Sequence, residues 1–171
     1  MSQTISFFVP GVPRTAGSKN VFINPKTGRP IITDDSGAQG RQWRRSVQAA
    51  AAAAYQGELL TGPLGLATVY FLARPRGHYG EGRNADRLLP SARPYPSVRP
   101  DLLKYTRAIE DALNKVIWRD DAQVVSEILD KRYADGESRP GVLVVVAQLP
   151  DETWPGFAAA QAVISAFGKE T

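Results

Sequence analysis

Acidic residues at the two ends of one predicted helix are the best candidates for chemistry. Asp101 follows Pro100 at the start of a predicted helix over 101–116, and Asp120 and Asp121 come just past its end, where a strand begins. Carboxylate oxygens are ligands for Mg²⁺, which is commonly held by one or two carboxylates together with substrate phosphate. Such an ion polarises a phosphodiester, lowers the pKa of a bound water and stabilises the leaving oxygen. These residue types therefore suit metal-dependent chemistry on a phosphodiester.

The helix between these acids sets a geometric condition on such a site. A straight helix of about 16 residues is roughly 24 Å long, so its two ends cannot share one ion. The following strand must double back along the helix, or a second chain must supply a ligand. A purely structural reading also accounts for these residues. Asp101 would then be an anion favoured by the helix dipole, and Asp120-Asp121 a turn.

The composition leads to carboxylates by elimination. The 171 residues contain no Cys and one His. Disulfide scaffolds, thiolate zinc sites, iron–sulfur clusters and cysteine nucleophiles are therefore excluded, as is every paired-histidine metal motif. A hydrophobic content of 43% with 22% charged residues argues against global disorder, and the length suits one domain with its own core.

The charges are divided unevenly along the chain. Residues 1–100 carry 13 Lys+Arg and 5 Asp+Glu, a net of +8, whereas residues 101–171 carry 8 and 12, a net of −4. A basic half that faces a polyanion, joined to an acidic half that holds cations, suits a metal-dependent nuclease. Two ordinary solvated surfaces would give the same numbers.

Periodicity and turn residues predict the elements that must position these acids. In the first half we expect a strand over 4–9, a hairpin with strands 21–23 and 30–33, a helix from about 34–36 to 56, and a central strand over 64–72. Apolar residues of the helix over 101–116 fall within one arc and form a buried face. Strands are predicted over 124–133 and 142–149. The fold class is therefore α+β, with a mixed sheet packed against two main helices.

The predicted domain organisation is one domain over residues 1–150, followed by a tail over 151–171 with a short Ala-rich helix near 157–167. The domain contains a loop over 74–100 that is rich in Pro, Gly and Arg, with six Arg against Glu81 and Asp86. A long segment without predicted secondary structure is usually functional or mobile. Its Arg and Tyr residues would suit phosphates and bases, and a plain surface insertion is the alternative.

No apolar run approaches the length of a membrane span, and the first residues lack the pattern of a signal peptide. We therefore expect a cytoplasmic protein with no membrane partner.

Three segments, taken in order, resemble the core of the RusA family of Holliday-junction resolvases. That core has the pattern Pro-Asp-x-Asp-Asn/Lys, then Asp-Ala-Leu, then Asp-Asp-x-Gln-Val and a Lys in the next strand. The matching segments here are RPDLLK at 99–104, AIEDALN at 108–114 and WRDDAQVV at 118–125, with Lys131 beyond them. The opening FFVPGVP at 7–13 and GSK at 17–19 also look like the family's first strand and basic loop.

The resemblance implies a small homodimeric endonuclease that cuts four-way DNA junctions in recombination and repair, with Mg²⁺ or Mn²⁺ bound by aspartates. By position, Asp101 and Asp121 match metal-binding and catalytic aspartates, and Asp120 is the neighbour of Asp121. Arg107 occupies the position of a catalytic Lys, where its cation would stabilise charge on the phosphate without transferring a proton. The family also suggests a bacterial cell and mildly a phage or prophage origin. The basic residues we expect at DNA are Lys19, Arg44, Arg45, Lys104 and Lys131, although Arg44 and Arg45 also fit a solvated helix face.

One position departs from the family pattern. Leu103 stands where the second Asp of Asp-x-Asp is expected, and it lies off the apolar face of the predicted helix. Glu110, two turns further on, is a poor replacement, and Glu127 on the next strand is a better one. Two alternatives therefore accompany the nuclease: a junction-binding protein with weakened catalysis, and an α+β interaction domain without a nucleic-acid role.

Overall fold

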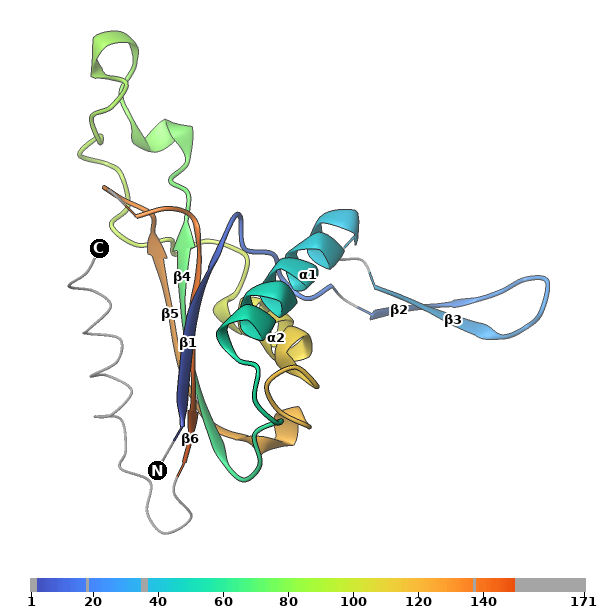
Figure 1. The fold of residues 1–171 in the computed structure, drawn as a ribbon. Coiled ribbons are helices and arrows are strands. Elements are labelled where there is room, and N and C mark those ends of the chain that lie inside the picture. Colours follow the sequence, from blue (N-terminus) through green and yellow to red (C-terminus); the bar gives the residue numbers. More distant parts are fainter. Residues whose placement is uncertain (1–2, 18, 35–36, 137, 150–171) are drawn as a thin grey trace.

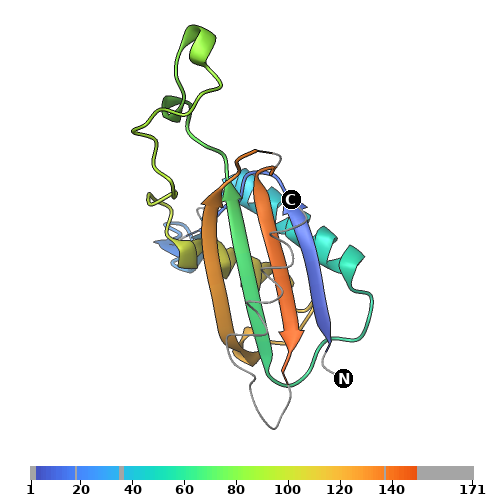
Figure 2. The same ribbon diagram turned by 90° about the vertical axis from the view of Figure 1, so that its left-hand side faces the viewer.

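The computed structural model describes residues 3–17, 19–34, 37–136 and 138–149, so the helix predicted near 157–167 lies outside the described residues. A four-stranded sheet with strand order β1-β6-β4-β5 forms one layer. Helices α1 (Gly37–Ala54) and α2 (Leu102–Leu113) form a second layer on one face of that sheet (Figure 1). Figure 2 views the sheet from the other face, with both helices behind the strands.

The sheet is mixed, as the predicted fold class requires. Its strands are β1 (Thr4–Pro10), β4 (Leu64–Leu72), β5 (Val124–Tyr133) and β6 (Gly141–Gln148). Strand β6 pairs antiparallel with both β1 and β4, whereas β4 pairs parallel with the edge strand β5. A parallel pair needs a long crossover, and the chain between β4 and β5 contains the long loop and α2. The α+β prediction is therefore confirmed.

The main core lies between the sheet and the two helices. Alternate residues of each strand point to one face, and those facing the helices include Leu66, Tyr70 and Val144, all buried. They pack with Trp43 of α1 and Ile109 of α2 in one cluster. Burial of this apolar surface is the main force that fixes α2 on the sheet.

Helix α2 is shorter than predicted, because it ends at Leu113 instead of 116. Lys115 has a φ of 64°, a left-handed conformation that cannot continue a right-handed helix. At 1.5 Å per residue the helix is about 18 Å long. Asp101 occupies the N-cap position, but its side chain makes no capping hydrogen bond.

The predicted hairpin forms a separate two-stranded sheet of β2 (Lys19–Ile23) and β3 (Pro30–Asp34). It extends away from the body beyond the helices (Figure 1). At its tip the side chain of Asn24 accepts a hydrogen bond from the backbone N–H of Lys26 (2.9 Å). Gly28 has a φ of 63°, a conformation that favours glycine.

The loop over 74–100 leaves the end of the sheet and contains two short 3₁₀ helices, Arg76–His78 and Gly82–Asn84 (Figure 1). Its first residue is firmly held, since Arg74 forms an ion pair with Asp135 and stacks on the ring of Tyr133 at 4.2 Å. In the described part of the chain, no helix has the length and apolarity that crossing a membrane demands.

Candidate active site along helix α2 and strand β5

Strand β5 runs back along α2, as required if residues of the following strand are to lie beside the helix. Beside the C-terminal end of the helix, Asn114 Nδ2 donates to Asp121 Oδ1 at 2.5 Å. Midway, Glu127 of β5 is close enough to Glu110 of α2 to raise its pKa. At the other end, Lys131 Nζ donates to two backbone carbonyls of the segment that leads into α2, at 2.9 and 3.1 Å.

The register of the parallel pair explains why Glu127 and Lys131 point toward the helices. Glu127 is paired with Leu66 of β4, and Lys131 is paired with Tyr70. Leu66 and Tyr70 belong to the core under the helices, and paired residues on neighbouring strands share a face. The polar residues Glu127 and Lys131 therefore lie at the sheet edge on the helix side, beside α2.

The surface of α2 that borders β5 is a stripe of four residues. Leu103, Arg107, Glu110 and Asn114 follow one another at intervals of three or four, which places them on one side of a helix. Leu103 is 67% exposed, so packing does not account for a leucine at this position. The stripe thus combines one cation, one carboxyl group and one amide, facing Glu127 and Asp121.

The carboxyl groups of this surface repel one another. Partial burial and, to a smaller extent, the neighbouring carboxylates of Glu127, Asp121 and Asp111 together raise the pKa of Glu110 to about 7, against the opposing effect of Arg107. Desolvation also raises the pKa of Glu127, although this residue is exposed at the sheet edge. Excess negative charge of this kind is what a divalent cation would neutralise.

A buried hydroxyl lies beneath these carboxyl groups. Tyr70 is fully buried and hydrogen-bonds to Thr106 Oγ1 of α2 at 3.4 Å. Burial raises the pKa of the Tyr70 hydroxyl, and the charges of Glu127 and Glu110 add to that shift. The hydroxyl therefore stays protonated and neutral under the acidic surface.

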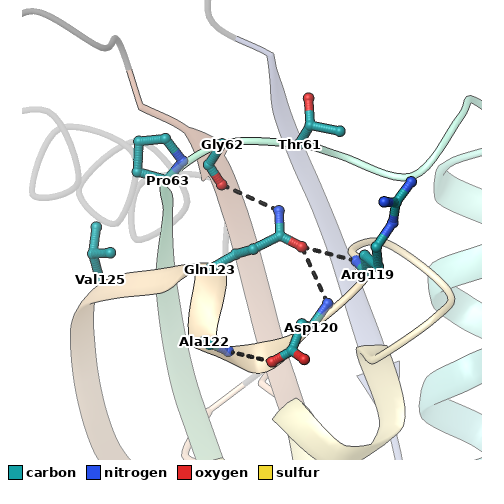
Figure 3. Close-up of a pocket in the computed structure, with 8 residues that line it drawn as sticks. All are labelled: Thr61, Gly62, Pro63, Arg119, Asp120, Ala122, Gln123 and Val125. Carbon is teal, nitrogen blue, oxygen red and sulfur yellow. Dashed lines mark hydrogen bonds between the residues drawn. The ribbon is translucent and has the colours of Figure 1, made fainter.

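The turn before β5 separates the roles of the two adjacent aspartates. Asp120 is the N-cap of the short 3₁₀ helix η3 (Asp121–Gln123), and its carboxylate accepts the backbone N–H of Ala122 at 2.9 Å (Figure 3). The side chain of Gln123 accepts the N–H of Asp120 and donates to the carbonyl of Gly62. Asp120 and Gln123 thus build the turn, whereas the Asp121 carboxylate faces Asn114.

A pocket of about 490 Å³ lies beside this turn, and Figure 3 shows its lining. Figure 3 shows that the side chains of Asp120 and Gln123 make hydrogen bonds within the turn, whereas the Thr61 hydroxyl and the Arg119 guanidinium make none among the residues drawn. Asp121 is not one of its lining residues, which are Thr61, Gly62, Pro63, Arg119, Asp120, Ala122, Gln123 and Val125. The pocket therefore lies apart from the acidic surface.

The three predicted metal ligands are not gathered at one point. Asp101 lies at the start of α2, exposed, with Lys104 Nζ 4.0 Å from its carboxylate, and Asp121 lies beside the other end. Over 3–17, 19–34, 37–136 and 138–149, no three acidic or histidine side chains form a group ready to hold a metal ion. Magnesium seldom needs such a cage, because waters and substrate phosphate complete its coordination.

The basic residues expected at DNA have different surroundings. Arg45 and Lys104 are exposed on α1 and α2, and Arg44 donates to the backbone carbonyl of Asp111 at 2.5 Å, which ties α1 to α2. Lys131 is half-buried and bonded to the backbone. Lys19 belongs to β2, and the surroundings of its side chain are outside the described structure.

Comparison with known proteins agrees with this arrangement. The family model described as Endodeoxyribonuclease RusA matches residues 14–147, which contain α1, α2, β4, β5 and the acidic surface. The chain belongs to the RusA endodeoxyribonuclease family. A curated protein of Bacillus subtilis (strain 168), "Uncharacterized protein YqaN", is 25% identical over 140 residues, which cover 82% of this chain and 94% of that protein.

Membership of the RusA family implies a nuclease of the Holliday-junction resolvase type, with a metal-dependent reaction and a DNA junction as substrate. The match spans residues 101–131 and so includes the acidic surface formed by Glu110, Asp121 and Glu127. It also includes Leu103, the departure from the family's Asp-x-Asp, so that departure lies inside the family domain.

Sequence reasoning missed two features of this site. The roles of Asn114 and Gln123 were not predicted, although both residues stand inside the quoted motifs. Glu127 was considered only as a replacement for the Asp missing at 103. The position of Glu127 beside α2 could have been predicted from the parallel pairing of β4 with β5, which the run of apolar residues in β4 favours.

Proposed function

We propose that this protein is a Mg²⁺-dependent, structure-specific endodeoxyribonuclease that resolves four-way DNA junctions in recombination and repair, acting as a homodimer. The observation that carries the proposal is the acidic surface between α2 and β5 in a chain of the RusA family. Mn²⁺ would serve as an alternative ion, since it favours the same oxygen ligands.

The donor set of the acidic surface suits magnesium. Asp121 and Glu127 supply carboxylate oxygens, and the pKa of Glu110 beside them is raised first by burial and then by these two carboxylates. We assign Asp121 and Glu127 as ligands of one ion. Asp101 lies at the other end of α2, about 18 Å away, so within one protomer it cannot share that ion, and it would act as a ligand only together with a second chain. Asp120, which the sequence also suggests as a ligand, uses one carboxylate oxygen to cap the turn, and its role as a ligand stays a prediction. A bound Mg²⁺ supplies Lewis-acid polarisation of the phosphodiester and an acidified water.

The side chains of this chain have their own tasks in the proposed reaction. Arg107 is exposed beside Glu110, where its guanidinium can pair with phosphate oxygens and stabilise the negative charge that builds up during displacement. Asn114 fixes the orientation of the Asp121 carboxylate through its amide. Lys131 fixes the segment before Asp101 and so positions that carboxylate, while its contact with DNA stays a prediction.

Loss of the Asp121 charge tests the assignment directly. We expect Asp121→Asn to reduce cleavage of a labelled four-way junction in Mg²⁺ by roughly 100-fold or more, since loss of even an outer-shell partner typically costs about 10- to 100-fold. Asp130→Asn is the matched control, because Asp130 lies on β5, the strand that follows Asp121, and pairs with Arg132. Undiminished cleavage by Asp121→Asn, or no cleavage by the unmodified protein with Mg²⁺ or Mn²⁺, would refute the proposal.

A second candidate function is a junction-binding protein with weakened catalysis, which the exposed Leu103 favours. Leu103→Asp would restore the family's second aspartate, and Leu103→Asn controls for removal of the exposed leucine. If Leu103 weakens the enzyme, we expect cleavage to rise by about 10-fold or more with Asp only, as a further carboxylate strengthens Mg²⁺ binding. Equal cleavage by the unmodified protein and Leu103→Asp would instead support Glu127 as the replacement ligand.

A further inference from the structure

The β2–β3 hairpin, called here the arm (residues 19–34), exposes an unusual amount of apolar surface. Val21, Phe22 and Ile23 of β2 are 62%, 59% and 64% exposed, and Ile31 of β3 is 44% exposed. Val21 and Phe22 are neighbours on one strand, so they point to opposite faces of the hairpin. Both faces therefore present large apolar side chains to solvent.

The tip of the arm is basic. Lys26 and Arg29 are exposed around the turn, and residues 21–31 contain no Asp or Glu. Pro25 and Pro30 are also exposed there. The arm thus combines cations with exposed apolar side chains. Its charge complements a polyanion, whereas it would be repelled by a second copy of a chain whose net charge is +4.

The root of the arm is fixed next to the candidate site. The backbone N–H of Ala16, just before β2, donates to the carbonyl of Lys104 in the first turn of α2 at 3.1 Å. The charge of Arg14 acts on the Tyr105 hydroxyl of the same turn. DNA bound at Asp101 and Arg107 would therefore meet the arm.

An isolated two-stranded hairpin is at best marginally stable in water, which suggests that the arm gains a partner when the protein works. We propose that the arm inserts into the four-way junction, with Phe22 and Ile31 against unstacked bases and with Lys26 and Arg29 on phosphates. This inference rests on the proposed function. Apolar side chains that enter between base steps unstack them at a cost of a few kcal/mol, and the arm offers two such side chains paired across its strands.

The experiment places 2-aminopurine at the centre of a four-way junction and follows its fluorescence, which rises when the base unstacks. We expect binding of the unmodified protein to raise the signal about twofold or more, and Phe22→Ser/Ile31→Ser to abolish the rise. Val12→Ser, which changes another exposed apolar residue outside the arm (57% exposed), should retain it. An equal rise with Phe22→Ser/Ile31→Ser would overturn the inference.

A second variant tests the charges without touching the strands. We expect Lys26→Ala/Arg29→Ala to lower the slope of log K against log salt by about 2, since each phosphate contact contributes roughly 0.9. An unchanged slope would overturn the phosphate contacts. Sedimentation of both variants tests whether the arm binds a second copy of the chain instead of DNA. Conversion of a dimer to a monomer would show that it does, and would overturn the inference.

These outcomes separate the arm from the proposed function. If the arm variants bind and cleave as the unmodified protein does, while Asp121→Asn is inactive, the nuclease stands and the arm inference is wrong. If the unmodified protein does not bind the junction even at low salt, both are wrong. Because the arm is outside the main core, the variants should keep the melting temperature of the unmodified protein.

Discussion

The carboxyl group of Glu110 is the centre of the repulsion on the acidic surface. Its pKa is about 7 in the folded protein against an ordinary value of 4.5, first because of burial and then because of Glu127 and Asp121. Between these two pH values the folded state binds a proton that the unfolded chain releases. The free energy of unfolding of the metal-free protein therefore falls as pH rises from about 4.5 to 7.

We expect Glu110→Gln, which cannot ionise, to remove this fall. Relative to the unmodified protein, the variant should gain on the order of 1 kcal/mol between pH 5 and 7.5, after allowance for solvent screening. Urea unfolding in the presence of a chelator at both pH values measures it. Glu58→Gln, at an exposed carboxyl group away from α2, is the control, and parallel pH dependences for Glu110→Gln and the unmodified protein would contradict the expectation.

Adjacent residues of one type show how far sequence reasoning reaches at this scale. Asp120 and Asp121 are adjacent residues of the same type, and only the position in the family motif favoured Asp121 as the ligand. The physical distinction is the capping geometry of η3, in which the Asp120 carboxylate accepts a backbone N–H. That geometry depends on Gln123 reaching the carbonyls of Leu60 and Gly62, which are far away in sequence, so local patterns could not reveal it.

The turn η3 is the element that aims Asp121, and Gln123 holds it. The Gln123 side chain makes four hydrogen bonds to backbone groups, of Leu60, Gly62, Arg119 and Asp120, between 2.9 and 3.1 Å. We expect Gln123→Ala to lower the free energy of unfolding by about 2 kcal/mol, because each such bond contributes about 0.5–1.5 kcal/mol and solvent replaces part of them.

Thermal unfolding of Gln123→Ala, with a melting temperature lower by about 5 °C, would check this expectation. Junction cleavage should fall with it at temperatures where the variant is folded, because the turn no longer fixes the Asp121 carboxylate. Gln42→Ala, on an exposed part of α1, is the matched control. If Gln123→Ala is as stable as Gln42→Ala, the hydrogen bonds of the Gln123 side chain do not stabilise the turn.

Elements with a strong periodic pattern were predictable, and their ends were less so. Strand β5 has the predicted bounds, 124–133, because β-branched residues and a following turn define it. Helix α2 ends three residues early, since the apolar face continues past Leu113 while Lys115 has a left-handed conformation and its backbone N–H donates to the carbonyl of Trp118 at 2.6 Å. The contact between α2 and β5 needs the parallel register, which no local pattern contains.

At the scale of the whole molecule, the α+β class and the mixed sheet followed from the order of elements, and the strand order did not. The uneven charge along the chain does not divide the molecule into two bodies, because β1 of the basic half pairs with β6 of the acidic half. Basic α1 packs beside α2, which belongs to the acidic half although its own charges balance, and Arg44 is bonded to the backbone of Asp111. A DNA phosphate beside this end of α2 would therefore meet side chains from both halves.

The pairing of β1 with β6 also governs how the chain folds. Thr4 is paired with Ala147, and Leu64 is paired with Gln148, so the sheet cannot close until residues 141–148 are available. Contacts this distant in sequence carry a large loop-closure entropy, and domains rich in them fold in milliseconds to seconds rather than microseconds. During synthesis, the apolar segments of β1 and β4 stay unpaired with β6 until most of the chain is made. In that interval the protein is most prone to aggregation.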